Sequence, residues 1–390
     1  MKDIQTFNMI ATEGLNLLEK DKYTLNETKE PEALLLRSKK IHDMAFNENL
    51  VSIARAGAGV NNIPVDRCSE EGIVVFNTPG ANANAVKEMV IAGLIMAARP
   101  IYRGINWLKE LEGDDISEQV EAGKKQFAGR ELAGKTLGVI GLGAIGSLLA
   151  TDAYHLKMDV IGYDPYVSVE TAWNISSRVK KAKSLQEVLR DADYISIHIP
   201  VNGNTAGYVN KEFINMMKDG AVLLNFARNE LIVKEDLIEA LDNGKLSKYV
   251  TDFAEREFFG HDRIMMFPHL GASTEEAEVQ CSIMAVNTLK YFLETGNIIN
   301  SVNFPTIDVP LQSAKRITIV NRNVPNMIGQ ISAILAKHFV NIDNILNRSR
   351  GNFAYTVIDI PEIESSLLEE VINQVQEING VLKTRVIERK

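Results

Sequence analysis

The sequence has 390 residues, of which 42 are Lys or Arg and 51 are Asp or Glu, giving a formal net charge of −9 at pH 7. A hydrophobic content of 45% is ordinary for a globular protein, and the length is sufficient for two or three domains. The negative charge argues against nucleic acid as a partner, because phosphate backbones are bound by a basic field.

Cysteine usage and the apolar segments favour the cytoplasm as the compartment. Cys68 and Cys281 do not have the spacing of metal ligands, so we expect a reduced protein without a metal site. The N-terminal residues lack the apolar core of a signal peptide. The most apolar stretch, residues 89–98, is too short to cross a bilayer. We interpret it as a buried helix that is also a candidate subunit contact, in a protein without membrane contact.

Short apolar runs alternate with helical patterns up to residue 267, which predicts parallel sheets covered by helices. In residues 1–98, strands are expected at 4–9, 32–36, 51–56 and 73–77. In residues 99–267, strands are expected at 135–141, 159–164, 193–200, 221–227, 248–254 and 263–267. The helix predicted at 275–296 has no sheet of its own to cover, so we expect the segment from 268 to 302 to return to the first domain. Ser273 and Glu276 have the spacing of a capping box, which predicts that this helix starts near Thr274.

The C-terminal part has a different element order. Residues 303–314 have weak periodicity and contain two prolines, which predicts a linker. Residues 315–390 have the order β-α-β-β-α-β of a ferredoxin-like module. Its strands are expected at 316–321, 341–349, 354–360 and 381–387, and its helices near 326–338 and 364–377.

Residues 135–166 carry the glycine pattern of a dinucleotide site. Gly141, Gly143 and Gly146 form G-x-G-x-x-G directly after a predicted strand and at the start of a predicted helix. The first glycine permits a tight turn, the second lets a pyrophosphate approach the backbone, and the third lets the helix pack on the strand. The helix N-terminus supplies N–H groups to the phosphates. Asp164 is expected to bind the ribose hydroxyls, and since no arginine follows it, NAD is favoured over NADP.

Polar residues follow three consecutive predicted strands: Arg228 the first, Asp252 and Glu257 the second, and His269 the third. The carboxyl ends of parallel strands share one edge, so these residues are expected to converge over a nicotinamide. An imidazole titrates near neutrality and carries a proton in both directions. A carboxylate such as Glu257 can orient the imidazole and stabilise its charged form, while the fork of Arg228 can clamp a carboxylate and polarise a carbonyl. Taken singly, each residue also has a structural interpretation, as a core histidine, a surface charge or a salt bridge.

Together, these motifs resemble the D-2-hydroxyacid dehydrogenases. The shared features are an arginine after "LLNFA", the spacing D-x-x-x-x-E, and "PHLG", and the resemblance covers residues 1–302. It implies an α/β fold with a discontinuous flavodoxin-like substrate domain and an inserted Rossmann NAD-binding domain, with Arg228, Glu257 and His269 as catalytic residues. Phe258 stands where the family usually has proline and the following loop is short, so Glu255 remains an alternative partner for the histidine.

The resemblance also implies contacts to the cofactor and to the substrate. The expected cofactor contacts are Gly141, Gly143, Ala144, Ile145, Gly146, Asp164, His198, Phe226, Ala227, Arg228, Asp252, His269, Gly271 and Ala272. The expected substrate contacts are Arg37, Ser38, Arg55, Ala56, Gly57, Asn82, Arg228 and His269. Arg37 and Arg55 follow apolar strands and are expected to meet a phosphate or carboxylate, and the backbone N–H groups of Ala56 and Gly57 to hold a carboxylate. Asn82, like Asn84, either caps the next helix or contacts substrate.

Within that family, residues 35–40, 54–63 and 77–88 resemble the substrate loops of 3-phosphoglycerate dehydrogenases. This implies oxidation of 3-phospho-D-glycerate to 3-phosphohydroxypyruvate, at the start of serine synthesis, by a homodimer or homotetramer. The alternatives are a reductase of hydroxypyruvate or another 2-oxo acid, and a non-catalytic NAD(H)-sensing protein.

The C-terminal module, at residues 317–345, resembles an ACT domain. The resemblance implies a serine effector held between paired ACT domains by Asn323 and Asn341, with Asn321 where a histidine is often found. An amide can satisfy both charged groups of a free amino acid. The alternative is a module that only dimerises.

Overall fold

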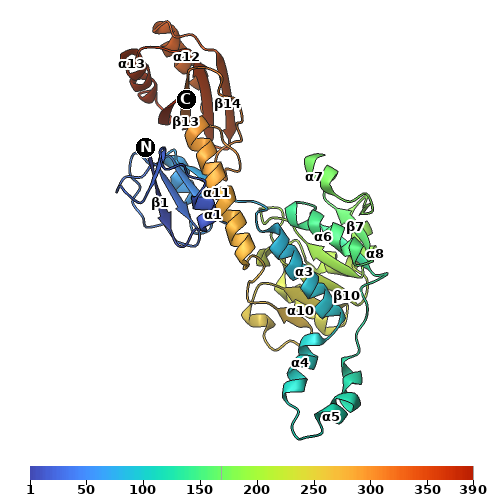
Figure 1. Cartoon of the computed structure of the whole chain (residues 1–390). Helices are drawn as coiled ribbons and strands as arrows, with labels where there is room; N and C mark the ends of the chain where they lie inside the picture. Colours follow the sequence, from blue (N-terminus) through green and yellow to red (C-terminus); the bar gives the residue numbers. More distant parts are fainter. Residues whose placement is uncertain (168, 390) are drawn as a thin grey trace. The chain divides into compact units, whose positions relative to one another are not determined.

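The computed structural model describes residues 1–167 and 169–389. The chain forms two compact units (Figure 1). The first unit comprises Met1–Asn82 and Glu278–Lys390, and the second comprises Ala83–Ala277. Residue 168, within the predicted domain 99–267, and residue 390, at the end of the predicted domain 315–390, lie outside the described residues. Among the described helices, none is long and apolar enough to cross a membrane.

The division between the units differs from the boundaries expected at residues 98 and 268. Helix α3 (Ala83–Ala98) lies in the second unit, where its Val90 shares a hydrophobic core with Leu149 of α6 (Ala144–His155). The loop at 268–274 also stays in the second unit, because its backbone is hydrogen-bonded to Asp252. The crossing points are therefore at 82/83 and 277/278.

The first unit contains a five-stranded parallel sheet of order β2-β1-β3-β4-β5. Strands β3, β4 and β5 are buried on both faces, as continuous apolar runs predict. Leu35 and Phe76 face a core shared with α11 (Glu275–Thr295), and Leu34 and Val75 face the opposite core, which includes Cys68 of α2 (Val65–Glu70). The long helix thus returns to this sheet, as expected. The other elements are β1 (Lys2–Phe7), α1 (Thr12–Leu15), β2 (Tyr23–Leu25), β3 (Ala33–Leu36), β4 (Ser52–Arg55) and β5 (Val74–Phe76).

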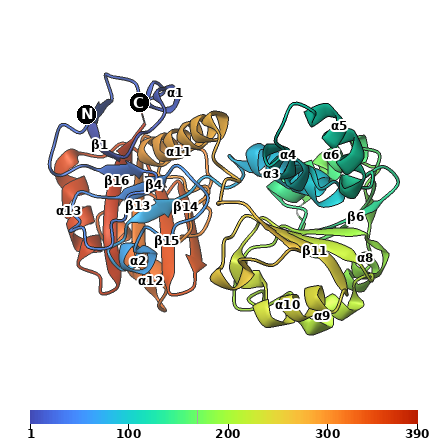
Figure 2. The same ribbon diagram turned by 90° about the horizontal axis from the view of Figure 1, so that it is seen from below.

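The second unit contains a seven-stranded parallel sheet of order β12-β11-β10-β9-β6-β7-β8. Helices α3 and α6 cover one face, and α8, α9 and α10 cover the other (Figure 2). The strands are β6 (Thr136–Ile140), β7 (Asp159–Tyr163), β8 (Lys180–Lys181), β9 (Tyr194–Ile197), β10 (Ala221–Asn225), β11 (Leu246–Thr251) and β12 (Ile264–Met266). The remaining helices are α4 (Ile101–Lys109), α5 (Ile116–Gly123), α7 (Val169–Asn174), α8 (Leu185–Asp191), α9 (Lys211–Met216) and α10 (Lys234–Asp242), with 3₁₀ turns η1 (Lys124–Phe127), η2 (Asn229–Leu231) and η3 (Arg256–Phe258). The short strands β2 and β8 were not predicted, because two or three residues are too few to show a periodic pattern.

The C-terminal module is a four-stranded antiparallel sheet of order β14-β15-β13-β16, the predicted β-α-β-β-α-β arrangement expected of an ACT module. Its helices pack on one face, where Ile331 and Val371 meet Ile319 and Ile358. The opposite face, through Tyr355, joins the core of the first unit. Both faces of the central strands β13 and β15 are thus covered within one chain, whereas β14 is mostly exposed. The elements are β13 (Lys315–Arg322), α12 (Met327–Lys337), β14 (Asn344–Arg350), β15 (Phe353–Ile360), α13 (Ser365–Gln376) and β16 (Val381–Glu388).

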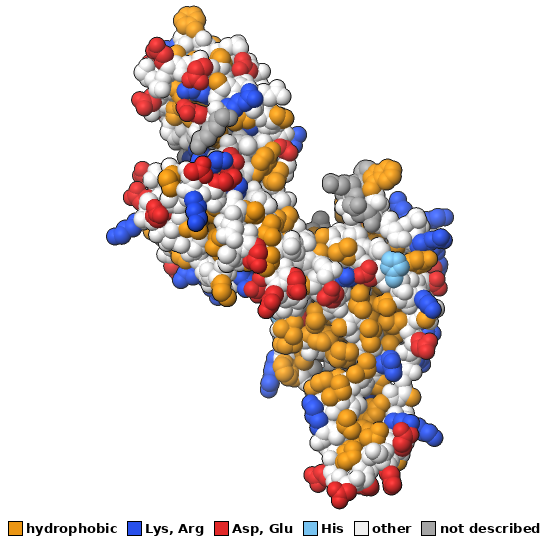
Figure 3. Space-filling view, viewed as in Figure 1, with side chains coloured by type: hydrophobic (Ala, Val, Ile, Leu, Met, Phe, Trp, Pro, Cys, Tyr) orange, Lys and Arg blue, Asp and Glu red, His pale blue; other side chains and the backbone are white. Residues whose placement is uncertain are grey.

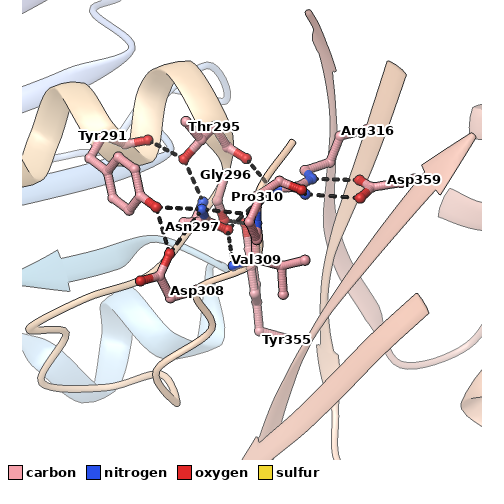
Figure 4. Close-up of polar contacts among 10 residues, drawn as sticks. All are labelled: Tyr291, Thr295, Gly296, Asn297, Asp308, Val309, Pro310, Arg316, Tyr355 and Asp359. Atoms are coloured by element: carbon pink, nitrogen blue, oxygen red, sulfur yellow. Dashed lines mark hydrogen bonds and ion pairs between the residues drawn. The ribbon is translucent and has the colours of Figure 1, made fainter. Parts of the chain in front are cut away.

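A buried arginine ties this module to the end of α11 (Figure 4). Arg316 on β13 has no exposed surface and forms a bidentate ion pair with Asp359 on β15, with Nε–Oδ1 and Nη2–Oδ2 distances of 2.6 and 2.9 Å. Its remaining N–H groups donate to Asn297 Oδ1 and to the carbonyls of Thr295, Val309 and Pro310. Tyr355 adds a hydrogen bond to the carbonyl of Gly296. The end of α11, the connection and the module are thereby held together.

The connection at 303–314 is packed, whereas we predicted a linker. Phe304 and Ile307 are fully buried. The side chain of Asn303 accepts from the amide of Val75 and donates to Ser69 and to the carbonyl of Ile73. Composition alone did not reveal this, because the apolar residues of the segment have no regular period.

Candidate active site

The glycine loop between β6 and α6 has the geometry of a phosphate cradle. Gly141 has φ +89°, and a Cβ there would lie 2.5 Å from the carbonyl oxygen of His198. A Cβ at Gly146 would lie 2.0 Å from the carbonyl oxygen of Gly141. At Gly143, in contrast, a Cβ would meet nothing within 4 Å, so the loop is open to an approaching ligand at this position.

The start of α6 offers donors to a pyrophosphate. Gly143 is the N-cap and no side chain caps the helix, so the first amides, at Ala144 and Ile145, have no intrahelical acceptor. Asp164 follows β7 and fixes the loop, since its Oδ2 accepts from the amide of Leu142 at 2.8 Å. Each carboxylate oxygen has a second lone pair for a ribose hydroxyl. These residues fit a dinucleotide.

His198 follows β9 at the same edge of the sheet. Its Nε2 lies 2.8 Å from Ser196 Oγ, and its Nδ1 is buried without a hydrogen-bond partner among the described residues. Burial lowers the pKa of His198 to about 4, so the ring is neutral at physiological pH. A buried nitrogen without a partner is available to a ligand donor or acceptor at this edge.

His269 lies in a strained turn after β12. Its φ is +56°, in the left-handed region that costs a non-glycine residue about 1–2 kcal/mol. Asp252, which is 3% exposed, accepts hydrogen bonds from the amides of Leu270 and Gly271 at 2.8 and 2.7 Å. This carboxylate therefore holds the turn, while the exposed imidazole packs its ring against Phe253 with a centroid distance of 5.2 Å. Sequence reasoning assigned Asp252 to the cofactor and did not anticipate this positioning role.

Arg228 extends from the turn after β10, with an exposed side chain and extended backbone. The turn is shaped by Asn225, a fully buried residue that sequence reasoning missed. Its Nδ2 donates to the carbonyl of Arg228 at 2.8 Å, and its Oδ1 accepts from the amide of Ala227 at 3.1 Å. An asparagine ending an otherwise apolar strand was the available signal, since a buried amide must be satisfied.

Both candidate carboxylates are engaged elsewhere. Glu257 forms an ion pair with Lys234 at 3.6 Å and is 54% exposed, whereas Glu255 pairs with the same lysine and with Asn229. No hydrogen bond or ion pair joins either of them to His269 among the described residues. The assignment of Glu257 or Glu255 as the partner of the histidine thus remains a prediction.

The other expected cofactor contacts surround this edge of the sheet. Phe226 is buried and packs on Phe267, with a centroid distance of 5.9 Å. Gly271 is buried and lies against Asp252, and Ala272 is exposed. The expected contacts of the second unit therefore all come from segments that follow the carboxyl ends of the strands. No group of three or more His, Cys, Asp or Glu residues in the described ranges could hold a metal ion.

The first unit holds the two arginines expected to meet the substrate. Leu36 and Arg55 are paired in β3 and β4, so Arg37 and Arg55 lie at the same edge of this sheet. Arg55 donates through Nε to the carbonyl of Arg37 at 2.9 Å and through Nη1 to the carbonyl of Gly59. Arg37 forms an ion pair with Glu278 at the start of the returning helix. Sequence reasoning missed this carboxylate, because no local pattern connects residues that are 241 positions apart.

Two expected donors near these arginines are already occupied. The amide of Ala56 donates to the carbonyl of Leu36 at 2.8 Å, and that of Gly57 to the carbonyl of Arg55 at 3.0 Å. The structure contradicts the prediction that these N–H groups hold a carboxylate, because each already has a backbone acceptor. The strand predicted at 51–56 already includes Ala56, and the amide of Ala56 continues the hydrogen bonding with β3.

The polar residues around the substrate loops have varied surroundings. Ser38 is exposed and its amide donates to Asn8, while Asn82 directly precedes α3. Asn84 lies in the first turn of that helix and donates to Glu88. Thr274, rather than Ser273, caps α11, since its Oγ1 accepts from the amide of Ala277 at 3.1 Å.

The three asparagines proposed for an effector do not meet within one chain. Asn321 is 1% exposed, so it is inaccessible to a ligand in this structure, which contradicts its predicted role. Asn323 is exposed beyond the end of β13, whereas Asn341 is exposed before the start of β14. Both strands run antiparallel to β15, so the two residues lie at opposite ends of the sheet, roughly 25 Å apart for strands of this length.

Comparisons with known proteins agree with this geometry. The family profile described as "D-isomer specific 2-hydroxyacid dehydrogenase, NAD binding domain" matches residues 91–271. The chain is 36% identical over 292 residues to D-3-phosphoglycerate dehydrogenase of Methanocaldococcus jannaschii, covering 73% of this chain and 54%, about half, of that protein. It is 37% identical over 258 residues to hydroxypyruvate reductase of Thermotoga maritima, covering 64% of this chain and 79% of that protein.

A solved structure extends the match to the fold. The NAD⁺-bound 3-phosphoglycerate dehydrogenase of Entamoeba histolytica matches with a TM-score of 0.60 and 27% identity, covering 77% of this chain and 98% of that one. The chain thus belongs to the D-isomer specific 2-hydroxyacid dehydrogenase family. Its second unit contains the NAD-binding domain of that family, so NAD, as predicted, is the cofactor.

Proposed function

We propose that the chain catalyses the NAD-dependent oxidation of 3-phospho-D-glycerate to 3-phosphohydroxypyruvate. The observation that carries the choice of substrate is the pair of arginines at one sheet edge of the first unit, Arg37 and Arg55, with Arg55 held by two backbone carbonyls. A phosphorylated acid carries more negative charge than lactate or glyoxylate, and a fixed guanidinium suits a phosphate. The similarity to the dehydrogenases of M. jannaschii and E. histolytica supports the same choice.

In the proposed mechanism, bound NAD supplies the hydride acceptor, and the residues of the chain handle the proton and the substrate charge. His269 takes the proton of the substrate hydroxyl during oxidation and returns it during reduction. Asp252 positions the histidine by holding the next two amides. Arg228 binds the substrate carboxylate and polarises the reacting carbonyl. Glu257, or else Glu255, stabilises the charged imidazole after a rearrangement of the Lys234 ion pairs.

A second candidate function is reduction of unphosphorylated hydroxypyruvate. It is favoured by the ion pair between Arg37 and Glu278, which neutralises one of the two arginines. The 37% identity to the hydroxypyruvate reductase of T. maritima points in the same direction.

Parallel assays of NADH oxidation with 3-phosphohydroxypyruvate and hydroxypyruvate separate these functions. The proposal expects kcat/KM to favour the phosphorylated acid by about 10- to 100-fold, since one charged contact contributes roughly 1.5–3 kcal/mol. The variant Arg55→Ala should raise KM for the phosphorylated acid alone. Arg67→Ala, which removes an arginine of α2 paired with Glu71, is the matched control and should leave both substrates unchanged.

Each other outcome has a defined meaning. Equal kcat/KM for both acids would favour the reductase. NADH binding without turnover of either acid would favour a non-catalytic NAD(H)-sensing protein.

We also propose that serine binds to paired C-terminal modules. Asn323 and Asn341 lie at opposite ends of one sheet, so a site using both requires two copies of the module. Asn321 is not part of this proposed site, because it is buried. A calorimetric titration should show serine binding that is lost in Asn323→Ala. The absence of heat with the wild-type chain would overturn this proposal and would favour a module that only dimerises.

The apolar surface of α4 supports a homo-oligomer. Figure 3 shows hydrophobic side chains gathered on the face of the second unit that bears α3 and α4. Ile101, Tyr102, Ile105 and Leu108 are 41–58% exposed, and no residue of α4 is buried. Isolated helices this short are marginal in water, and symmetric pairs of identical chains are the commonest assemblies. We propose that a second copy covers this helix.

A further inference from the structure

A cleft in the NAD-binding unit lies at the amino ends of its parallel strands, whereas the glycine loop follows their carboxyl ends. Its volume is about 620 Å³, within the usual size range of small-molecule sites. Its wall includes Lys135 before β6, Asp193 before β9, Gly220 before β10, and Lys248 near the start of β11. The glycine loop and His269 follow the carboxyl ends of the parallel strands. About five residues of strand, roughly 15 Å, therefore separate the cleft from that edge.

The wall of this basic cleft carries an unusual charge for an acidic protein. Five cations contribute to it, against two carboxylates, although the whole chain has a net charge of −9. The cations are Arg103, Arg130, Lys135, Lys218 and Lys248. A concave surface lined by one sign of charge concentrates counter-ions of the other sign.

The two carboxylates neutralise only one of these cations, Lys218. Asp193 accepts from the amide of Thr136 at 2.9 Å and from Lys218 at 3.0 Å, so both of its oxygens are in use. Asp219 pairs with Lys245, which is not part of the wall, and is 90% exposed. Among the described residues, the negative charge of the wall thus pairs with Lys218 alone and leaves the other four wall cations without an ion pair.

In the described ranges, no hydrogen bond or ion pair is found for the side chains of Arg103, Arg130 or Lys135, although Lys135 interacts electrostatically with Asp193. Lys248 donates to the carbonyl of Ala97 at 2.6 Å. Burial and the positive charge of Arg103 lower the pKa of Lys248. Cations crowded together without counter-ions are unfavourable unless an anion lies between them.

A hydroxyl and small side chains complete the wall. Tyr194 is 6% exposed, and its phenol has no hydrogen-bond partner among the described residues. The small residues Ala97, Ala98 and Ala128 leave room for a ligand beside the charges. Guanidinium, ammonium and phenol groups all donate hydrogen bonds, so the wall offers many donors around one space.

We propose that this basic cleft binds a small, multiply charged anion bearing phosphate or carboxylate groups. Arg103 and Arg130 provide the forks for its oxygens, and Lys135 and Lys248 provide compact charges. The site is separate from the cofactor and the reacting groups, so it is available while NADH is bound. The volume admits a molecule of metabolite size and exceeds what a single ordered water needs.

Calorimetric titration of the full chain at saturating NADH tests the proposal. The probes are inorganic pyrophosphate and citrate, which distinguish a phosphate site from a carboxylate site. NADH occupies the glycine loop, so phosphate binding there does not contribute to the heat. The substrate arginines Arg37 and Arg55 can also bind either probe, so the heat assigned to the cleft is the part that a cleft variant removes. The double variant Arg130→Gln with Lys135→Gln should weaken binding on the order of tenfold or more, as expected for the loss of charge-assisted contacts.

A matched control removes the same charge elsewhere in the unit. Lys180→Gln with Arg190→Gln also removes two cations, both 62–74% exposed and paired with surface carboxylates. This variant should bind the anion like the wild type. Equal weakening in both double variants would reveal a general effect of net charge and overturn the proposal, as would the absence of saturable heat with either probe.

Sedimentation velocity tests the remaining alternative, in which an acidic segment of another protein chain occupies the cleft. Under the proposal, the cleft variant sediments like the wild type. If it changes the assembly state and leaves anion binding intact, the cleft is a protein contact and the proposal fails.

Discussion

Removal of Arg316 should destabilise the first unit more than removal of a residue from an exposed ion pair does. The substitution Arg316→Met leaves the carboxylate of Asp359, 3% exposed, without a cation. Breaking a buried ion pair on one side costs about 3–5 kcal/mol, because the remaining charge stays desolvated. That is a large part of the roughly 5–15 kcal/mol by which a typical domain is stable.

The double variant Arg316→Met with Asp359→Leu removes both charges. Replacement of a buried pair by apolar residues is often neutral, so this variant should be more stable than Arg316→Met by at least about 2 kcal/mol. Arg322→Met is the matched control in the same module. Arg322 pairs with Glu70, and the two side chains are 46% and 54% exposed. Its loss should cost less than about 1 kcal/mol.

Urea unfolding with two probes measures the effect and locates it. The two tryptophans, Trp107 and Trp173, both belong to the second unit, so their fluorescence reports that unit. Far-UV circular dichroism reports both units. For an m value of about 2 kcal/mol/M, the dichroism midpoint of Arg316→Met should fall by about 1.5–2.5 M, while the fluorescence midpoint should not move. A shift no larger than that of Arg322→Met, or a double variant no more stable than the single one, would refute the reasoning.

Three further predictions concern the second unit. His269→Asn introduces a residue type that tolerates positive φ but cannot carry a proton, so turnover should fall by about 10²-fold or more. A fluorescence titration should show unchanged NADH affinity. Normal turnover would assign the proton transfer to another residue. Because the pKa of His198 is lowered from 6.5 to about 4, the unfolded chain binds its proton first as pH falls, and stability is lost between pH 6.5 and 4. Between pH 7 and 5, His198 should lower the free energy of unfolding by about 2 kcal/mol. The fall in Tm between these two pH values should therefore be smaller in His198→Gln than in the wild type. An equal fall in Tm for both proteins would contradict the prediction. Ile105→Glu should shift sedimentation to a smaller species if a second copy covers α4, and an unchanged profile would exclude that face.

The two carboxylates next to Lys234 show what a sequence pattern cannot predict. The spacing from Asp252 favoured Glu257 over Glu255, yet both pair with the same lysine in the structure. Spacing reports which residues follow a strand, but not which of several charges a folded loop brings together. The same limit applies to Ala56, whose amide the sheet uses, and to Asn321, which packing buries.

The sequence by itself determined the order of the elements, the glycine loop, and the set of polar residues at the strand ends. These depend on local rules: apolar periodicity, the freedom of glycine at positive φ, and the alignment of carboxyl ends in parallel sheets. Tertiary structure alone decided that α3 joins the second unit, that Asp252 holds the turn of His269, and that Arg316 joins the C-terminal module to α11. It also decided that cations from separate segments line one cleft. Contacts of this kind join residues far apart in the chain, and they depend on packing and desolvation, which no local pattern encodes.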